Sequence, residues 1–288
     1  MTVQNSPAGS LDSHRAIGEL VAERPARARL FEHLHVDYCC GGQRTLAEAC
    51  SKAGLQLETV QAALLALDEI GTDSAATETS DWRMAGSEAL CEHIVAVHHE
   101  FLRRGFPRIE SLLGTVVRVH GEEEPALGEL PRVFGTIRSA LEPHLASEET
   151  ELFPAILAAE AGGPAVAVEV LAGHEYEHEQ VGAALTELRT LCHDFDRRTA
   201  RCNTHRALLD ALEELEMDVH QHVHEENNVL FARARSAGAN AIPRHRSPSR
   251  ANAIRPPAVP QRVQTLPACC QGWVANQGER WARTRRGS

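Results

Sequence analysis

A histidine and a glutamate lie on the apolar stripe of a long helical pattern around residue 222. The apolar residues before them are spaced by four and three, which is typical of one buried face of a helix in a bundle. Continuing these steps places His222 and Glu226 on that face. A buried imidazole and carboxylate are costly unless compensated, and side chains four residues apart can converge on one metal ion. The preceding apolar residues are Leu208, Leu212, Leu215 and Val219.

The same helical phase predicts which nearby polar residues face solvent. His220, His224 and Glu225 lie off the apolar stripe. His93 and His98 lie off the stripe of an earlier segment. We therefore expect these four histidines to be solvated.

Three earlier segments repeat the pattern, with apolar stripes that are interrupted by polar residues. They run over residues 95–120, 130–152 and 171–192. Each has the spacing of a helix packed on one face, so each is expected to carry metal-binding groups into the core. The polar residues on these stripes that are considered as ligands or as partners of ligands are His99, His144, Glu148, His174 and His178.

The turns between these segments predict that the polar residues lie at one level. In an antiparallel bundle, residues at one level are equidistant from the connecting turn. The midpoints between successive candidate ligands are near residues 122, 162 and 201, and all three fall in Gly-, Pro- or polar-rich stretches that mark turns independently. The sequence therefore predicts an all-α fold, an up-down-up-down four-helix bundle. The residues brought to one level are His99, His144, Glu148, His178, His222 and Glu226.

Four imidazoles and two carboxylates at one level of a core indicate a metal site. They are too many for one tetrahedral zinc and include no thiolate. Imidazole with carboxylate suits iron or manganese, and two carboxylates can bridge a pair of ions. We expect two iron ions, with an oxo or hydroxo bridge and open positions for O₂ or NO. The alternative is a set of core histidines that the glutamates satisfy.

A small helical unit over residues 11–71 precedes the bundle and carries adjacent cysteines. Cys39 and Cys40 come just before a helix predicted to start after Thr45, and Arg44 is close in the chain. A helix N-terminus and a neighbouring cation both favour a thiolate. Cys39 and Cys40 are therefore candidate functional thiols, and the alternative is a loop with two incidental thiols.

Composition divides the chain further and restricts its partners. Residues 72–86 indicate a linker, 87–235 the bundle, and 236–288 a disordered, Arg-rich tail. Residues 1–232 carry 18 basic and 39 acidic side chains, which argues against nucleic acid as the main partner. No signal peptide or long apolar run is present, so neither secretion nor a membrane is expected. Reduced thiols and a cytoplasmic location are the expectation.

The motifs together resemble the iron–sulfur cluster repair di-iron proteins of the ScdA/YtfE (RIC) type. The resemblance covers roughly residues 12–235 and both predicted domains. The hemerythrin-like part matches at His99 and over residues 144–154, 177–182 and 222–231. The N-terminal signature is Asp37-Tyr38-Cys39-Cys40-Gly41-Gly42.

This resemblance implies a carboxylate-bridged non-haem di-iron centre, with Glu148 and Glu226 as the bridges. It also implies a stress-response role in restoring iron–sulfur clusters damaged by nitric oxide or peroxide, with damaged iron–sulfur proteins as partners. The resemblance further implies that Cys39 and Cys40 are functional thiols. The protein would be a monomer or a homodimer.

The sequence leaves two other functions and two histidine roles open. The chain could be a hemerythrin-like O₂ or NO sensor or store, or it could reduce NO at the di-iron site, so enzyme activity is undecided. His174, one turn before His178, is either an extra ligand or a partner of a ligand, and we favour the second role. His120 shares the stripe but lies about 30 Å along a straight helix from His99, so we expect it at a helix end.

Overall fold

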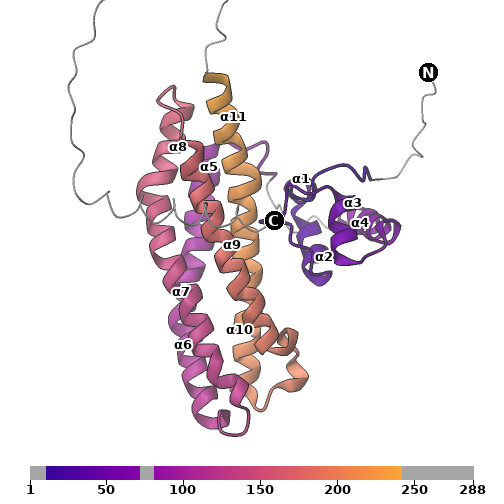
Figure 1. Ribbon diagram of the computed structural model, residues 1–288, viewed down its shortest axis with the longest axis vertical. Coiled ribbons are helices and arrows are strands. Elements are labelled where there is room, and N and C mark those ends of the chain that lie inside the picture. The colour runs from indigo at the N-terminus through magenta and orange to yellow at the C-terminus, as the bar shows by residue number, and fades with distance from the viewer. Residues whose placement is uncertain (1–10, 72–80, 242–288) are drawn as a thin grey trace, which may run out of the picture. The chain divides into compact units, whose positions relative to one another are not determined.

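The computed structural model describes residues 11–71 and 81–241, and over these ranges the chain is helical (Figure 1). The described residues form no strand, apart from a single bridge between Ala16 and Thr45. The predicted all-α class is therefore confirmed. None of the helices in these ranges is long and apolar enough to cross a membrane.

The small N-terminal domain packs four short helices around its own apolar core. Its helices are α1 (Ile17–Glu23), α2 (Ala28–His33), α3 (Leu46–Ala53) and α4 (Leu57–Gly71). The patches expected from the sequence meet there, because one face of each helix is apolar. The buried core includes Ile17, Leu20, Val21, Phe31, Leu46, Val60 and Leu64.

The boundaries of α3 are set by local capping groups. The Thr45 side chain accepts a hydrogen bond from the Glu48 amide, and the Glu48 carboxylate accepts one from the Thr45 amide. This capping box satisfies two of the amides that a helix leaves unpaired at its start. Gly54, at φ 69°, ends the helix in the left-handed region that favours glycine. The predicted helix start after Thr45 is confirmed.

Four long helical rods form the second domain. The first joins α5 (Ser87–His93) to α6 (Glu100–His120), and the second joins α7 (Leu130–Ser147) to α8 (Phe153–Glu160). The third is α9 (Val168–Leu191). The fourth joins α10 (Asn203–His224) to α11 (Phe231–Ala241). α6 packs against α7 and α10, and α9 packs against the same two helices, so the rods close into a bundle (Figure 1).

The connections between the rods lie where the sequence places them. The predicted turn positions 122, 162 and 201 all fall between consecutive rods. The fourth rod continues to Ala241, so residues 236–241, expected in the disordered tail, are helical. The rest of that tail (242–288), part of the expected linker (72–80) and residues 1–10 lie outside the described residues.

Three of the four rods contain a π-helical turn at the same level. These turns are Ile94–His99, Glu148–Leu152 and Glu225–Leu230. A π-turn inserts one extra residue, which moves the side chains after it by about 100° around the helix. Such turns are frequent at functional sites. Each of the three contains at least one candidate ligand.

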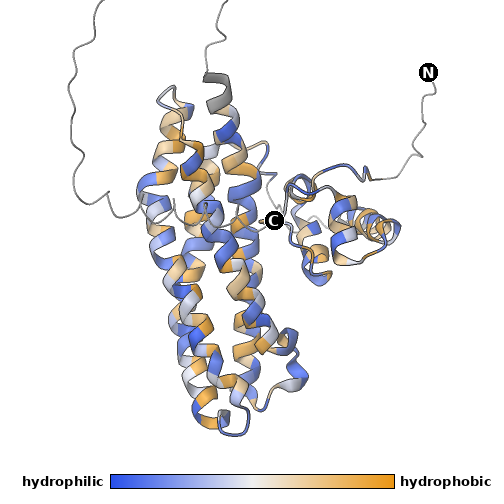
Figure 2. Cartoon of the chain, in the orientation of Figure 1, coloured by the Kyte–Doolittle hydropathy of each residue, from blue (hydrophilic) through white to orange (hydrophobic). Residues whose placement is uncertain are grey.

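Two apolar cores lie on either side of that level. One contains residues from α6, α7, α9 and α10, including Leu102, Ile137, Leu185 and Leu212. The other contains residues from α5, α8 and the start of α11, including Leu90, Ile156 and Phe231. Hydrophobic and hydrophilic residues are interspersed along each rod (Figure 2). The polar level is thus enclosed by packed, water-excluding side chains.

Replacing the α3 cap tests the local account of this helix. We expect Thr45→Ala to destabilise α3 by about 1 kcal/mol, because an unpaired helix amide loses its acceptor. Amide hydrogen exchange of residues 46–53 in the full chain should then be about five-fold faster. Thr45→Ser, which retains the hydroxyl, is the control and should exchange at nearly the original rate. Equal protection in the alanine variant would contradict this role of the cap.

Candidate metal centre

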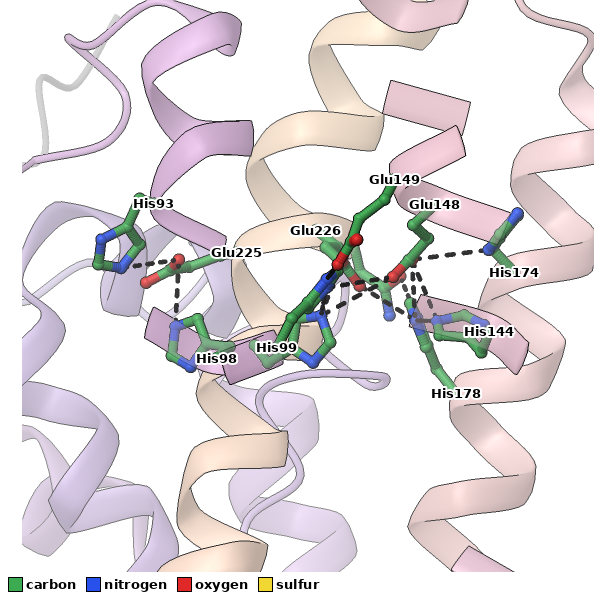
Figure 3. Close-up of polar contacts among 12 residues, drawn as sticks. His93, His98, His99, His144, Glu148, Glu149, His174, His178, Glu225 and Glu226 are labelled. Carbon is green, nitrogen blue, oxygen red and sulfur yellow. Dashed lines mark hydrogen bonds and ion pairs between the residues drawn. The ribbon is translucent and has the colours of Figure 1, made fainter. Parts of the chain in front are cut away.

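Six predicted ligands from the four rods meet at one level of the bundle (Figure 3). Each of them is at most 4% exposed. They belong to two overlapping groups, in each of which the nitrogen and oxygen ligand atoms lie within 4.8 Å of one another. One group is His99, Glu148, His222 and Glu226, and the other is His144, Glu148, His178 and Glu226.

The four imidazoles form two pairs. His99 and His222 bring their Nε2 atoms to 3.2 Å of each other. His144 and His178 bring theirs to 2.9 Å. Within each pair the two rings point the same type of nitrogen at one place, as ligands of a shared ion do.

Each carboxylate divides its two oxygens between the two imidazole pairs. Oε2 of Glu148 lies 3.5 Å from His99 Nε2, while its Oε1 lies 3.0 Å from His144 Nε2. Oε1 of Glu226 lies 3.0 Å from His222 Nε2. Its Oε2 lies 3.1 Å from His178 Nε2. Both carboxylates therefore span the two places toward which the imidazoles point.

Several buried carboxylate oxygens in this cluster have no hydrogen-bond partner among the described residues. Among the described residues, both oxygens of Glu148 and Oε2 of Glu226 are buried without a hydrogen bond. Burial alone raises the pKa of Glu148, but contacts with His144 and other imidazoles outweigh it and hold that pKa well below its usual range. Burial and the charge of Glu148 raise the pKa of Glu226, yet His222 and His178 bring it to about 2. Two ionised, buried carboxylates at one point fit a metal site.

Three of the four imidazoles are oriented by bonds at their other nitrogen. With Nδ1 engaged in this way, Nε2 remains directed at the cluster, and such outer partners are typical of histidine ligands. Each partner is adjacent in sequence to a candidate ligand, so this adjacency is a signal that the sequence contains. The bonds join His99 to Glu149 (2.6 Å), His144 to Glu177 (2.6 Å) and His178 to Asn227 (3.0 Å).

The donor set fits a pair of first-row transition ions. Each half of the cluster offers two imidazole nitrogens and two carboxylate oxygens, a combination that suits iron or manganese. Four protein ligands would leave an octahedral ion with free positions. Among the described residues, Cys39 and Cys40 belong to a separate group of potential ligands with Asp37.

Two family descriptions match the two domains. Residues 13–68 match ScdA_N, a domain of unknown function (DUF542), and residues 92–234 match the hemerythrin HHE cation binding domain. The chain is 33% identical over 220 residues to the iron–sulfur cluster repair protein YtfE of Edwardsiella ictaluri, covering 76% of this chain and 96% of the relative. The YtfE proteins of Yersinia pestis and Pectobacterium carotovorum are 32% and 31% identical, with 96% of each covered, over 77% and 76% of this chain.

The chain belongs to the iron–sulfur cluster repair family. The ScdA_N match lies in the small domain and the hemerythrin match lies in the bundle.

The sequence left open the roles of two further histidines, His174 and His120. His174 lies beside the cluster, with its Nδ1 3.6 Å from Glu148 Oε1. That nitrogen is buried and, in the described chain, has no hydrogen bond. His120 lies at the end of α6, with its Nε2 3.3 Å from the sulfur of Cys202, in agreement with its expected position.

The expectation that the remaining histidines are solvated is wrong for two of them. His98 and His224 are only 4% and 1% exposed, and Glu225, also off the predicted stripe, is 3% exposed. His98 and Glu225 lie in π-turns, where the constant helical step used in the prediction fails. His224 is covered by Tyr38 of the small domain, with ring centroids 5.5 Å apart.

His93 and His220 are only half-buried, so neither is fully solvated. His220 is held at its Nδ1 by Glu32, 3.0 Å away.

The thiol-bearing turn of the small domain is fixed to the fourth rod by Asn228. Its amide nitrogen donates to the carbonyl of Cys39 at 2.9 Å and to that of Tyr38 at 3.3 Å. Gly42 approaches so closely that a Cβ there would lie 2.3 Å from the Asn228 amide oxygen. Only glycine fits such an approach without movement.

The pKa values of the two thiols in this turn are shifted in opposite directions. Their sulfurs are 3.9 Å apart. The contact with Cys40, together with burial, raises the pKa of Cys39 well above its usual value. The same contact lowers the pKa of Cys40, although burial opposes this. Arg44 pairs with Asp37 at 3.5 Å, and its expected effect on the thiols stays a prediction.

A cavity of about 360 Å³ opens beside the thiols. The small domain and the bundle both line it, and bundle side chains at its wall include Arg189, Glu216 and His220. Arg189 and Glu216 form an ion pair there. The thiols thus face a charged recess.

Thiol alkylation as a function of pH tests the asymmetry between the cysteines. We expect iodoacetamide to modify Cys40 faster than Cys39, with a midpoint below pH 9, because the thiolate is the nucleophile. In Cys39→Ala the midpoint for Cys40 should move upward, since the stabilising contact is lost. Peptide mass spectrometry separates the sites, and exposed Cys202 is the internal reference. Faster modification of Cys39 would contradict the assignment.

Substitution of a shared carboxylate tests the metal centre. We expect Glu226→Gln to lose the visible absorption of paired irons and at least one metal equivalent relative to the unchanged chain, because the amide cannot bridge two cations. Elemental analysis and absorption spectra provide the measurement. Glu149→Gln is the matched control: it should keep the paired spectrum with roughly 10- to 100-fold weaker metal affinity. An unaltered spectrum and metal count in Glu226→Gln would refute the bridging role.

Proposed function

We propose that this chain repairs iron–sulfur clusters damaged under nitrosative and oxidative stress, and that a di-iron centre in the bundle supports this activity. The single observation that carries the di-iron part is the division of the oxygens of Glu148 and Glu226 between two imidazole pairs. Family membership supports the repair part, because the relatives are named as iron–sulfur cluster repair proteins.

In this proposal His99 and His222 would hold one ion and His144 and His178 the other, and Glu148 and Glu226 belong to both groups of potential ligands. When bound, paired irons supply electron-transfer chemistry and affinity for O₂, NO or peroxide. The chain itself supplies orientation: Glu149 and Glu177 accept the Nδ1 protons of His99 and His144. The two apolar cores exclude water from either side.

The cysteine turn supplies the proposed link to damaged iron–sulfur proteins. Cys40 is half-buried at the wall of the cavity, and its lowered pKa favours a thiolate that can bind iron. We propose that Cys39 and Cys40 act on the iron of the damaged partner. Location in the cytoplasm and a monomeric or dimeric state remain predictions.

A repair assay tests the role of the thiols. The full chain is mixed anaerobically with an NO-damaged [4Fe–4S] dehydratase, and recovery of that enzyme's activity is followed. We expect Cys39→Ser to slow recovery several-fold without loss of the chain's own metal. Cys202→Ser, which alters an exposed thiol at another turn, is the control and should repair normally. Undiminished repair by Cys39→Ser would remove that thiol from the proposal.

His174 favours one alternative, a hemerythrin-like sensor or store. Its free, buried Nδ1 lies 3.6 Å from Glu148, near enough to add an imidazole to one ion after a small shift. A store would form a stable, reversible O₂ adduct, whereas a repair protein is expected to be oxidised without one. Exposing anaerobic diferrous protein to O₂, then removing the gas, distinguishes the two. A reversible adduct that disappears in His174→Ala would favour the store.

A further inference from the structure

A second group of potential ligands lies beside the six-residue cluster, outside every role assigned above. His93, His98 and Glu225 gather on one side of it and turn toward one another (Figure 3). The carboxylate oxygen Oε2 of Glu225 is 3.5 Å from His93 Nε2 and 3.5 Å from His98 Nε2. All three ligand atoms lie within 4.8 Å of one another.

Two of these atoms are buried and unsatisfied. His98 Nε2 and Glu225 Oε2 form no hydrogen bond among the described residues, and their side chains are only 4% and 3% exposed. Leaving such groups unpaired costs about 1–3 kcal/mol each, more when they are charged. A cation between them would satisfy both.

The other atoms of these residues are fixed by neighbours. His98 Nδ1 lies 2.9 Å from Asp218 Oδ1, an arrangement of carboxylate and imidazole that typically orients a histidine ligand. The Gln221 amide donates to Glu225 Oε1 at 2.9 Å, which leaves Oε2 directed at the imidazoles. The ring of His93 packs on Trp82, with centroids 4.4 Å apart. The three donor atoms are therefore held in place.

The distances suit a metal ion. With bonds of about 2.1 Å at tetrahedral angles, ligand atoms lie about 3.4 Å apart. The two contacts of 3.5 Å to Glu225 match this spacing without rearrangement. Two imidazoles with one carboxylate are a donor set for zinc or for mononuclear non-haem Fe(II), and both leave positions for water. His93 is half-buried, so the group lies near the protein surface.

We propose that His93, His98 and Glu225 form a third, mononuclear site for a divalent transition metal, Fe(II) in the iron-loaded protein. The site is separate from the paired centre but adjoins it. His98 precedes His99 in the chain, Glu225 precedes Glu226, and the ring of His98 stacks on that of His222 with centroids 5.6 Å apart. The identity of the metal rests on the proposed function, whereas the existence of the site does not.

Metal stoichiometry in two backgrounds tests the proposal. The full chain is stripped with a chelator, reloaded anaerobically with ferrous ion, desalted and analysed for iron. We expect the unchanged chain to bind one equivalent more than His93→Ala or Glu225→Gln, while the visible spectrum of the paired centre stays the same. His193→Ala, a substitution of an exposed histidine at another turn, is the control and should bind as much as the unchanged chain.

The second background removes the paired centre. In Glu226→Gln one equivalent that depends on His93 should remain, so Glu226→Gln combined with His93→Ala should lose it. Circular dichroism checks that each variant is folded.

Iron contents unchanged by His93→Ala and by Glu225→Gln in the intact chain would overturn the third site. Loss of the paired spectrum in both variants would also overturn it, because these residues would then support the paired centre. Failure of the unchanged chain to form a pair would count against the proposed function alone.

Discussion

The structure of the bundle depends on two buried carboxylates, whose negative charge must be balanced by positive charge. Glu148 and Glu226 are fully buried, and each faces imidazoles from other rods. Without compensation, a buried ionised carboxylate would shift its pKa and neutralise. Here the imidazoles contribute to that balance: although burial lowers the pKa of His144, contacts with Glu148 raise it to about 9. The four rods are thus tied at one level by charge, and this level requires the apolar cores on either side to exclude water.

Much of this centre could be predicted from periodicity because a bundle translates sequence distance into height. The equal spacing of His99, His144 and His178 from the intervening turns needs only regular rods and short connections. The start of α3 could be predicted for a similar reason, since Thr45 and Glu48 interact within one turn of helix. Features that depend on local, regular geometry can therefore be predicted from the sequence.

Features that depend on irregular geometry or on partners distant in sequence cannot be predicted in this way. The π-turns break the constant step of the helix, so His98 and Glu225 are buried where a regular phase exposes them. His224 is buried because Tyr38, far away in sequence, packs on it. The docking of Asn228 on the Cys39 carbonyl also joins residues that no local pattern connects. These contacts require knowledge of how the two domains meet.

Four consecutive residues of the last π-turn serve four different tasks. Glu225 faces His93, Glu226 faces both imidazole pairs, Asn227 orients His178, and Asn228 holds the backbone beside the thiols. Since they share one stretch of backbone, a displacement at any of them is transmitted to the others over a few bonds. One short segment of backbone therefore sets both the position of the Glu226 carboxylate in the bundle and the position of the Cys39 carbonyl in the small domain.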